Sequence, residues 1–346
     1  MSKWINNNLN ERRLMLQEIA RERNISQKSV EKDWWVTMVL KALFQTRFAP
    51  YLLFKGGTSL SKGWHLISRF SEDIDLSFDR KWFFEQGFQY AACDNKSQRE
   101  RLRKKSREIV TTLFSDELKT QLQELGLAGF EVVPVTTKTT KDGVVPIDSD
   151  KDPTVLQVKY PCIVESEAGF DYVEPVVKVE ISCLSLSEPF APCAIRSFIY
   201  EKYPNEDDEC LCTINIVSPE RTFLEKAFLL NEEFQKAKPR TRRMSRHYYD
   251  LEILMDTEFG RKALTNRDLY NRIIDHRRQF NKLHFVDYEL NRSENIRFYP
   301  PQELMDAFRA DYANMVSAFI FKEAPSFDEL MRRIAELQER FRAMGK

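Results

Sequence analysis

Hydrophobic residues recur at helical spacing over residues 8–46, which predicts two helices at the start of the chain. The second helix is expected to begin after Ser26, a residue type that commonly caps helices, and to carry Trp34 on its apolar stripe. A short apolar run over residues 51–54 indicates a buried strand. Residues 59–68 are then expected to be helical, and residues 73–78 to form a second strand.

The pattern changes further along the chain. Residues 97–125 are predicted to be a strongly charged helical region, whereas residues 130–200 are rich in Val, Ile, Thr and Pro, a composition that favours strands. Residues 206–209, Glu-Asp-Asp-Glu, are expected to form an exposed acidic loop. Beyond Ser218 helical periodicity continues to a charged final helix from Ser326. We therefore predict an α/β domain over 1–205, including the helices within 8–46, and a helical domain over 210–346.

Composition agrees with this organisation. A chain of 346 residues is longer than one ordinary domain needs, and its 42% hydrophobic and 31% charged content is typical of a soluble folded protein. No apolar stretch reaches the length of a membrane span and no signal-peptide core precedes the first helix, so we expect a cytoplasmic protein without a membrane partner. The six cysteines include no C-x-x-C pair, and the four histidines form no metal motif.

A glycine turn follows the first predicted strand. Gly56 and Gly57 lack a Cβ, so the backbone can turn tightly there and approach a ligand closely. We expect Thr58 or Ser59 to cap the next helix, whose free N–H groups would favour a phosphate. The segment matches neither a Walker A loop nor a dinucleotide-binding fingerprint. It therefore predicts a phosphate-binding turn of another kind.

Two aspartates occupy one face of the next predicted strand. Alternation places Ile74, Leu76 and Phe78 on one face, and Asp73, Asp75 and Ser77 on the other. Neighbouring carboxylates repel each other unless a cation is present, and Mg²⁺ with a triphosphate supplies one. Each feature alone is common on a solvated strand face and in a capped helix. Their order, with the glycine turn shortly before the aspartates, predicts a site for nucleotidyl transfer.

A third carboxylate is expected on a neighbouring strand, because nucleotidyltransferases of the polymerase-β type often carry one. The best candidate strand covers residues 176–183, in which Val177, Val179 and Ile181 alternate with Glu180. Glu180 either completes a metal site with Asp73 or lies on a wet strand face. The predicted fold class is thus an α/β (α+β) nucleotidyltransferase fold with a mixed sheet, followed by a mostly α-helical C-terminal domain.

Two segments carry a family resemblance: residues 55–62, Lys-Gly-Gly-Thr-Ser-Leu-Ser-Lys, and residues 69–76, Arg-Phe-Ser-Glu-Asp-Ile-Asp-Leu. Three further stretches, 30–36, 218–226 and 246–251, match the same family in the same order. The chain resembles the AbiEii/AbiGii nucleotidyltransferase toxins of type IV toxin–antitoxin and phage-abortive systems. This resemblance implies that a nucleoside triphosphate binds with Mg²⁺ or Mn²⁺ and that a nucleotidyl group moves to an acceptor. It also implies a cognate antitoxin encoded nearby and, as acceptor, the end of tRNA.

The resemblance assigns roles to particular residues. Phosphate binding falls to Gly56, Gly57, Thr58, Ser59 and Lys62; metal binding to Asp73 and Asp75; and the lysine and aspartate required in the second domain are Lys226 and Asp250. Relatives commonly have Arg-Asp-x-Tyr-Asp where this chain has Arg246-His247-Tyr248-Tyr249-Asp250. His247 therefore replaces an acidic position, which removes support for a metal or proton role there.

The second domain can also be interpreted from its own pattern. Ser218 is expected to cap a helix that starts with Pro219. On their helices Lys226 and Asp250 both have apolar neighbours at three and four residues. Lys226 is therefore expected at the edge of the apolar stripe, where it either extends to solvent or points into a cleft, and Asp250 is expected to face inward. They either form a buried ion pair, or Lys226 reaches the triphosphate while Asp250 positions it or activates the acceptor hydroxyl. In the second case we expect the active site in a cleft between the domains.

Two basic stretches are candidates for binding RNA. Residues 236–246 contain six cations and no acidic residue, and the candidate RNA contacts are Lys238, Arg240, Arg242, Arg243 and Arg246. Residues 96–107 are a weaker candidate. The alternative for both is a solvated loop or helix. Because formal net charge is zero, any RNA contact depends on such local patches.

The sequence thus predicts a Mg-dependent nucleotidyltransferase toxin that acts on an RNA acceptor, and tRNA is the first expectation. It does not separate GTP from CTP or UTP as substrate. Two other functions stay open at this point. One is a nucleotide-binding or interaction protein of the same fold, and the other is transfer of a nucleotidyl group to a protein hydroxyl.

Overall fold

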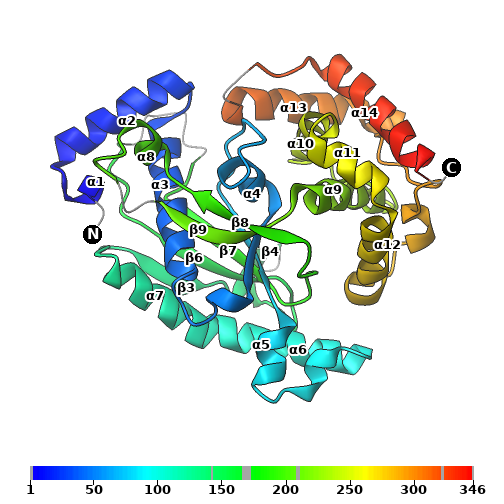
Figure 1. Ribbon diagram of the computed structural model, residues 1–346, viewed down its shortest axis with the longest axis horizontal. Helices are drawn as coiled ribbons and strands as arrows, with labels where there is room; N and C mark the ends of the chain where they lie inside the picture. Colours follow the sequence, from blue (N-terminus) through cyan, green and yellow to red (C-terminus); the bar gives the residue numbers. More distant parts are fainter. Residues whose placement is uncertain (1–2, 142, 166–172, 208–210, 321–322, 345–346) are drawn as a thin grey trace. The chain divides into compact units, whose positions relative to one another are not determined.

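The computed structural model describes residues 3–141, 143–165, 173–207, 211–320 and 323–344 (Figure 1). The described residues form two compact units. Unit 1 takes its residues from 1–63 and 71–216, and unit 2 from Trp64–Phe70 and 217–346. The short segment Trp64–Phe70, which follows the motif at 55–62 and includes the first two residues of the motif at 69–76, therefore belongs to unit 2.

A seven-stranded mixed sheet forms the centre of unit 1, in the order β3-β6-β7-β2-β1-β9-β8. Strand β2 pairs in parallel with β7, and β1 in parallel with β9, whereas the pairs β1–β2, β3–β6 and β6–β7 are antiparallel. The predicted mixed sheet is confirmed. Its strands are β1 Leu52–Lys55, β2 Ile74–Phe78, β3 Glu131–Pro134, β6 Thr154–Lys159, β7 Val176–Ser182, β8 Phe190–Ile195 and β9 Cys212–Val217.

Strand β2 shows the expected alternation as far as Leu76, but Ser77, expected on the face of Asp75, is buried as well. Ile74, Leu76 and Phe78 of β2 are fully buried, whereas Asp75 between them is only half-buried. Each such apolar side chain contributes about 1.5–3 kcal/mol when it is taken fully out of water. Because side chains alternate strictly along a strand, this burial of one face fixes the direction of Asp75 on the other.

Helix α3 (Gln27–Leu43) is the central helix of unit 1. It begins after Ser26, whose hydroxyl accepts a hydrogen bond from the Ser29 amide at 3.0 Å, as predicted. Almost every residue of α3 is buried, because α2, α7, α8 and strand β7 pack around it. Its charged side chains therefore need partners inside the protein. The other helices of unit 1 are α1 Lys3–Asn6, α2 Leu9–Arg23, α4 Gly56–Lys62, α5 Arg80–Glu85, α6 Lys96–Ile109, α7 Ser115–Glu124 and α8 Phe198–Lys202.

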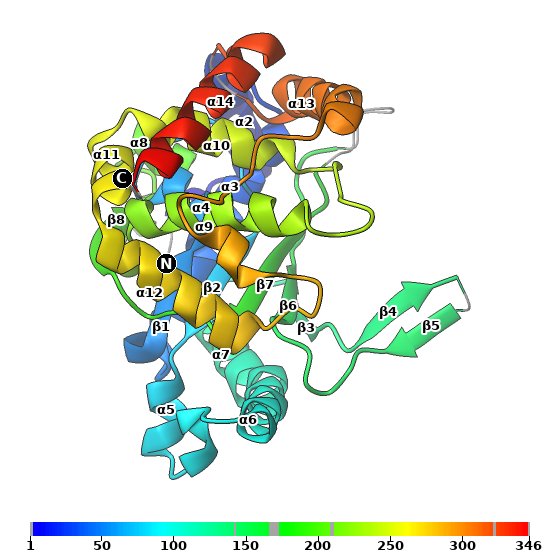
Figure 2. The same ribbon diagram turned by 90° about the vertical axis from the view of Figure 1, so that its right-hand side faces the viewer.

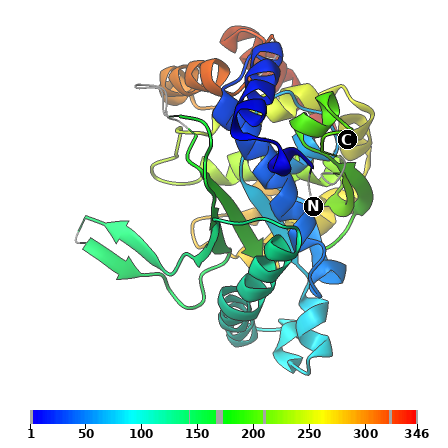
Figure 3. The same ribbon diagram turned by 90° about the vertical axis from the view of Figure 1, so that its left-hand side faces the viewer.

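Helices α6 and α7 cover the predicted helical region 97–125, with a π-helical turn at Val110–Phe114 between them. Strands β4 (Thr137–Thr140) and β5 (Gly143–Pro146) form a separate two-stranded ribbon that projects from the sheet of unit 1 (Figures 2 and 3). The ribbon is largely exposed, so it adds little to the core.

Unit 2 is helical, as predicted. Its main helices are α9 Pro219–Glu233, α10 Ser245–Met255, α11 Glu258–Thr265, α12 Arg267–His276, α13 Met305–Phe319 and α14 Phe327–Ala343. Its core contains Phe223 and Phe298, whose rings lie 5.6 and 5.1 Å from that of Phe341 on α14. The final helix α14 begins after Ser326, which caps it. The predicted cap by Ser218 is wrong: Ser218 stands at the N-cap position of α9, but its hydroxyl has no hydrogen-bond partner among the described residues.

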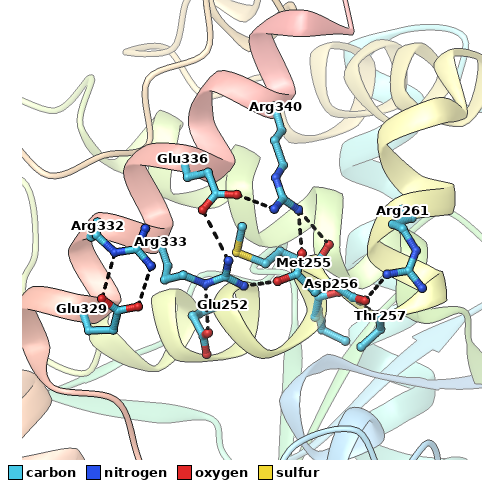
Figure 4. Close-up of polar contacts among 11 residues, drawn as sticks. Glu252, Met255, Asp256, Thr257, Arg261, Glu329, Arg332, Arg333, Glu336 and Arg340 are labelled. Atoms are coloured by element: carbon cyan, nitrogen blue, oxygen red, sulfur yellow. Dashed lines mark hydrogen bonds and ion pairs between the residues drawn. The ribbon is translucent and has the colours of Figure 1, made fainter.

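A network of ion pairs joins α14 to the end of α10 (Figure 4). Arg333 pairs with Glu252, Asp256 and Glu336, and Arg340 shares Asp256 at 2.8 Å. Hydrogen bonds from Arg340 and Arg333 hold the pKa of Asp256 below its usual value. The charged final helix is therefore attached to unit 2 by charged as well as apolar contacts.

The helix expected over 59–68 is wrong in both bounds, since α4 spans Gly56–Lys62. After Gly63, the Trp64 indole donates to the Val217 carbonyl at 3.0 Å, and His65 adopts a positive φ of 52°. A left-handed residue cannot continue a right-handed helix. The chain therefore leaves α4 early and joins unit 2.

The exposed acidic loop expected over 206–209 is wrong at Asp207, which is fully buried. Its carboxylate accepts hydrogen bonds from the Trp34 indole at 3.0 Å and from the Ser197 hydroxyl at 2.6 Å. These two donors compensate for its lost hydration. Residues 208 and 209 lie outside the described residues. No described helix is both long and apolar enough to cross a membrane.

Candidate active site

The glycine turn brings the backbone directly against Asp75. Gly56 has a φ of +80°, and a Cβ placed on it would lie 2.2 Å from Oδ2 of Asp75. Both the conformation and the space exclude a side chain at this position. The register agrees, because Lys55, the last residue of β1, lies opposite Asp75 on β2. Gly56 and Gly57 are themselves half-exposed, so this backbone is accessible beside the carboxylate.

The side chains of Thr58 and Ser59 do not cap α4 as expected, because the helix already begins at Gly56 and its cap residue is Lys55. The Thr58 hydroxyl donates to the carbonyl of Asp73 at 2.5 Å and lies 2.7 Å from the Ser71 hydroxyl. Ser59 donates to the Gly56 carbonyl at 2.8 Å. Both side chains are buried, so they shape the site from inside.

Glu180 lies directly beside Asp75, as the parallel register of β2 and β7 pairs these two residues. Lys178, two residues earlier on β7, donates a hydrogen bond to Glu180. Although burial acts to lower it, the pKa of Lys178 lies above its usual value because of Glu180 and, more weakly, Asp73 and Asp75. By register, Asp75 and Glu180 share this strand face with Lys178 and Lys55, and Asp73 lies near enough to affect the pKa of Lys178. Three carboxylates against two lysines leave a net negative charge.

This carboxylate face fits a divalent cation. Carboxylate oxygens are hard ligands, and Mg²⁺ is commonly held by one or two of them while substrate phosphates and waters complete its shell. Across the described residues, no three His, Cys, Asp or Glu side chains meet closely enough to form a complete metal site by themselves. The pair Asp73 and Asp75, beside the bare Gly56, suits such a shared shell, and Glu180 as a third ligand stays a prediction.

Lys62, expected to bind phosphate, is buried at the end of α4 and has three acceptors. Its ammonium lies 2.7 Å from Asp33 Oδ1, 2.8 Å from Thr37 Oγ1 and 3.0 Å from the Arg196 carbonyl. Asp33 also accepts a hydrogen bond from the Phe198 amide at 2.8 Å. Burial raises the pKa of Asp33, and Lys62 acts against that rise. Lys62 thereby fixes α4 to α3.

Unit 2 contains a buried cluster of two cations and one anion, which we call the Asp250 cluster. Arg69 donates from Nε and Nη2 to the two oxygens of Asp250, both at 2.7 Å, and the Lys226 ammonium lies 2.9 Å from Oδ2. The Asp250 side chain is completely buried and those of Arg69 and Lys226 nearly so. The ion pair considered from the sequence is therefore present, but with a second cation, so the cluster carries one excess positive charge.

The cations set the protonation of this cluster. Burial acts to raise the pKa of Asp250, but Arg69 and Lys226 hold it well below its usual value, so the carboxylate is charged. Burial lowers the pKa of Lys226, against the attraction of Asp250. The pKa of buried His247 is likewise held well below its usual value by burial and then by Lys226 and Arg246. His247 is neutral at physiological pH, and its Nδ1 has no hydrogen-bond partner among the described residues.

Residues 236–246 form a loop that two carboxylates hold in place. Glu233 accepts from the backbone amide and the guanidinium of Arg240 and pairs with Lys236 at 2.7 Å. Burial acts to raise the pKa of Glu233, but the hydrogen bonds from Arg240 and Lys236 lower it to about 2. Asp311 accepts from the backbone amides of residues 243 and 245. The exposed basic side chains on this anchored loop are Lys238, Arg240, Arg242 and Arg243, and Arg246 is half-buried.

The second basic stretch, on α6, is partly structural. Arg99 and Arg107 are buried and donate to the carbonyls of Cys93 and Val135 at 3.2 and 3.1 Å. Arg103 pairs with Asp150 at 3.1 Å. These contacts leave fewer cations of α6 available to a ligand than the sequence suggests.

Sequence reasoning assigned no role to Arg69 or Lys32. Arg69 opens the segment 69–76, and its contact with Asp250 links positions that lie far apart in the sequence. Lys32 is buried on α3 and pairs with Glu72 at 2.8 Å. No signal in the sequence indicated the burial of Lys32, because Asp33, Thr37 and Lys41 recur four residues apart and predict a polar face on this helix.

Comparison with known protein families gives the class of protein: the chain is a nucleotidyltransferase. It belongs to the AbiEii family, the nucleotidyl transferase AbiEii toxins of type IV toxin–antitoxin systems, whose family model matches residues 39–333. The resemblance carried by the sequence motifs is thereby confirmed. Family membership indicates a nucleoside triphosphate as substrate, a divalent metal and a cognate antitoxin.

Among solved structures, the chain is similar to MenT4, a nucleotidyltransferase toxin from Mycobacterium tuberculosis H37Rv. The two are 18% identical with a TM-score of 0.44, and the match covers 95% of this chain and 98% of MenT4. No curated protein sequence matches the chain.

Proposed function

We propose that Asp73 and Asp75 hold Mg²⁺ or Mn²⁺ and that the protein transfers a nucleotidyl group from a nucleoside triphosphate to a hydroxyl of RNA, with the tRNA acceptor end as the first candidate. The observation that carries this proposal is the close approach of Gly56 to Asp75, where a Cβ would lie 2.2 Å from the carboxylate. A bare, half-exposed backbone beside a carboxylate suits a phosphate that shares a cation with that carboxylate.

In the proposed reaction the acceptor hydroxyl attacks the α-phosphorus and pyrophosphate leaves. The bound cation would supply neutralisation of the charge that develops on the phosphoryl oxygens. The residues of the chain position the reacting groups. Gly56 and Gly57 let the phosphates approach, and Thr58 fixes the backbone of Asp73 through its 2.5 Å hydrogen bond. Because little covalent chemistry falls to the protein, positioning and charge account for most of the rate.

For the Asp250 cluster we propose a role toward the triphosphate anion. Its one excess positive charge is buried, and an anionic ligand near Lys226 would compensate it. Asp250 is a weak base because its pKa is held low by Arg69 and Lys226. Of the two roles open from the sequence, this favours Asp250 as the residue that orients Lys226 over a role as base for the acceptor hydroxyl.

For the RNA we propose contacts with the basic loop, through Lys238, Arg240, Arg242, Arg243 and Arg246. Glu233 and Asp311 bind the loop backbone, so the exposed cations are presented on a fixed main chain. Arg240 also pairs with Glu233 at 2.8 Å, so part of its charge is already compensated within the protein. Lys236 is engaged by Glu233 as well.

The test is a product assay. Each of the four nucleoside triphosphates, labelled at the α-phosphorus, is incubated with the protein, total tRNA and Mg²⁺, and the products are separated by size. We expect label on RNA with one or two of the triphosphates and none after chelation of the metal. Label on protein alone would replace RNA by a protein hydroxyl as the acceptor. Absence of label on every acceptor would leave a nucleotide-binding function instead.

A further inference from the structure

We propose that Lys32 and Asp33 of α3 are positioning residues that hold both catalytic motifs in place. This inference rests on the proposed function, because it assigns the parts that keep Asp73 and the glycine turn in register. Lys32 pairs with Glu72, the residue directly before Asp73, and Asp33 pairs with Lys62, the last residue of the glycine-turn helix α4.

The ammonium of Lys62 has a protein acceptor for each of its hydrogens. An ammonium group has three hydrogens to donate, and Lys62 has acceptors at 2.7, 2.8 and 3.0 Å in Asp33, Thr37 and the Arg196 carbonyl. A phosphate would have to displace one of these buried partners. The geometry therefore favours Lys62 as the anchor of α4, in place of the direct phosphate contact that the family resemblance implies.

The Lys32–Glu72 pair is similarly enclosed. The side chain of Lys32 is 5% exposed and that of Glu72 is 15% exposed, with 2.8 Å between ammonium and carboxylate. Water does not screen a pair at this depth as it screens a surface pair. Because Glu72 immediately precedes Asp73, a fixed Glu72 restricts where the Asp73 carboxylate can lie.

Both pairs start from one turn of one helix. Helix α3 is buried on all sides, so it provides a rigid base for Lys32 and Asp33. The hydroxyl of Thr58 adds a third connection, since it binds the Asp73 carbonyl from the first turn of α4. The chain between Gly63 and Ser71 is part of unit 2, so these contacts are what hold its two ends within unit 1.

Supporting residues around metal ligands have a measurable signature, because their loss typically reduces metal affinity or activity by about 10–100-fold. We expect Lys32→Met to weaken Mn²⁺ binding, measured by electron paramagnetic resonance with a non-hydrolysable nucleoside triphosphate, by about tenfold or more. The Mg²⁺ concentration for half-maximal label transfer should rise in parallel. The charge-exchanged double variant Lys32→Glu/Glu72→Lys should recover most of both.

The matched control is Glu31→Gln on the same helix. Glu31 is equally buried, but its partners are the Ile163 amide and Cys162, outside both motifs. We expect this variant to change the unfolding temperature while leaving Mn²⁺ affinity within about twofold of wild type. A Lys32→Met protein that matches the control in Mn²⁺ affinity would overturn the inference, even if it is less stable.

Variants of Lys62 provide an independent test of the inference. We expect Lys62→Gln to reduce transfer and the neutral pair Asp33→Asn/Lys62→Gln, which can still form a hydrogen bond, to recover it at least tenfold, about 1.4 kcal/mol. A double variant as inactive as the single one would restore Lys62 as a phosphate ligand and overturn its assignment as an anchor. Mn²⁺ affinity distinguishes failure of this inference from failure of the proposed function. If the wild-type protein binds Mn²⁺ but transfers no label, only the proposed function is contradicted.

Discussion

The carboxylate face of unit 1 and the Asp250 cluster of unit 2 are opposites in charge and in exposure. Asp75 on β2 and Asp73 just before it are half-exposed carboxylates, Glu180 lies beside Asp75, and two lysines, Lys55 and Lys178, lie nearby. Asp250 is fully buried with two cations around one anion. The first arrangement has an excess of negative charge that suits a cation, and the second has an excess of positive charge that suits an anion.

Because of this difference in charge, we expect substitutions in the carboxylate face to reduce activity and substitutions of Asp250 to reduce stability. Removing one of two neighbouring carboxylates relieves repulsion in the free protein, so it should cost little stability. Removing the single anion of a buried cationic cluster leaves charge uncompensated and should cost much.

The largest expected effect is on transfer, from Asp75→Asn. Loss of a metal ligand removes several kcal/mol of transition-state stabilisation, so the rate should fall about 1,000-fold or more. The free energy of unfolding without metal should change by less than about 1 kcal/mol, because the exposed face loses a like-charge contact. Initial rates of label transfer and urea unfolding measure the two quantities. Asp116→Ala, an exposed residue of α7, is the control and should be active. A large loss of unfolding free energy in Asp75→Asn would contradict the expected difference in stability between the carboxylate face and the Asp250 cluster.

The next effect is on stability, from Asp250→Asn. Breaking a buried ion pair by removing one partner costs about 3–5 kcal/mol, and here two cations would be left. Urea unfolding gives the change in free energy. Lys226→Met should cost less stability, because Arg69 still pairs with Asp250, but it should reduce transfer by about 100-fold, as for lost transition-state donors. Equal stability losses in the two variants would contradict the charge count of the cluster.

The pH dependence of stability should follow the same cluster. The pKa of Asp250 is lower in the folded protein than in the unfolded chain, where it is about 3.9. Its contribution is therefore fully present above about pH 4 and is lost as the pH falls further toward the folded value. The unfolding free energy of wild type should fall more steeply below about pH 4 than that of Asp250→Asn. Parallel curves for the two proteins would show that Asp250 is not held as an anion.

The carboxylate face could be predicted from the sequence more fully than the Asp250 cluster. The strand face was predictable because strict alternation places Asp73 and Asp75 opposite Ile74 and Leu76, and the structure agrees for Asp75. Helix bounds near the glycine turn were not, because the left-handed His65 and the contact of Trp64 with Val217 depend on tertiary structure. Arg69 could not be paired with Asp250 from spacing alone, since their contact joins residues 181 positions apart.

The smallest expected effect concerns RNA. Arg242→Ala/Arg243→Ala removes two exposed cations of the basic loop, so the slope of log affinity against log salt should fall by about 0.7 per lost phosphate contact on single-stranded RNA. Nucleoside triphosphate binding should be unchanged. Filter binding at several salt concentrations measures the slope. Arg267→Ala, an exposed cation at the start of α12, is the control, and an equal effect from it would remove the special role of the loop.

The most direct measurement of the central claim compares two positions of the label in one nucleoside triphosphate, with wild type and Asp75→Asn side by side. The account predicts that label at the α-phosphorus reaches the acceptor, that label at the γ-phosphorus leaves with pyrophosphate, and that Asp75→Asn does neither. Label from the γ-position on the acceptor, or α-label transfer by Asp75→Asn at the wild-type rate, would contradict it.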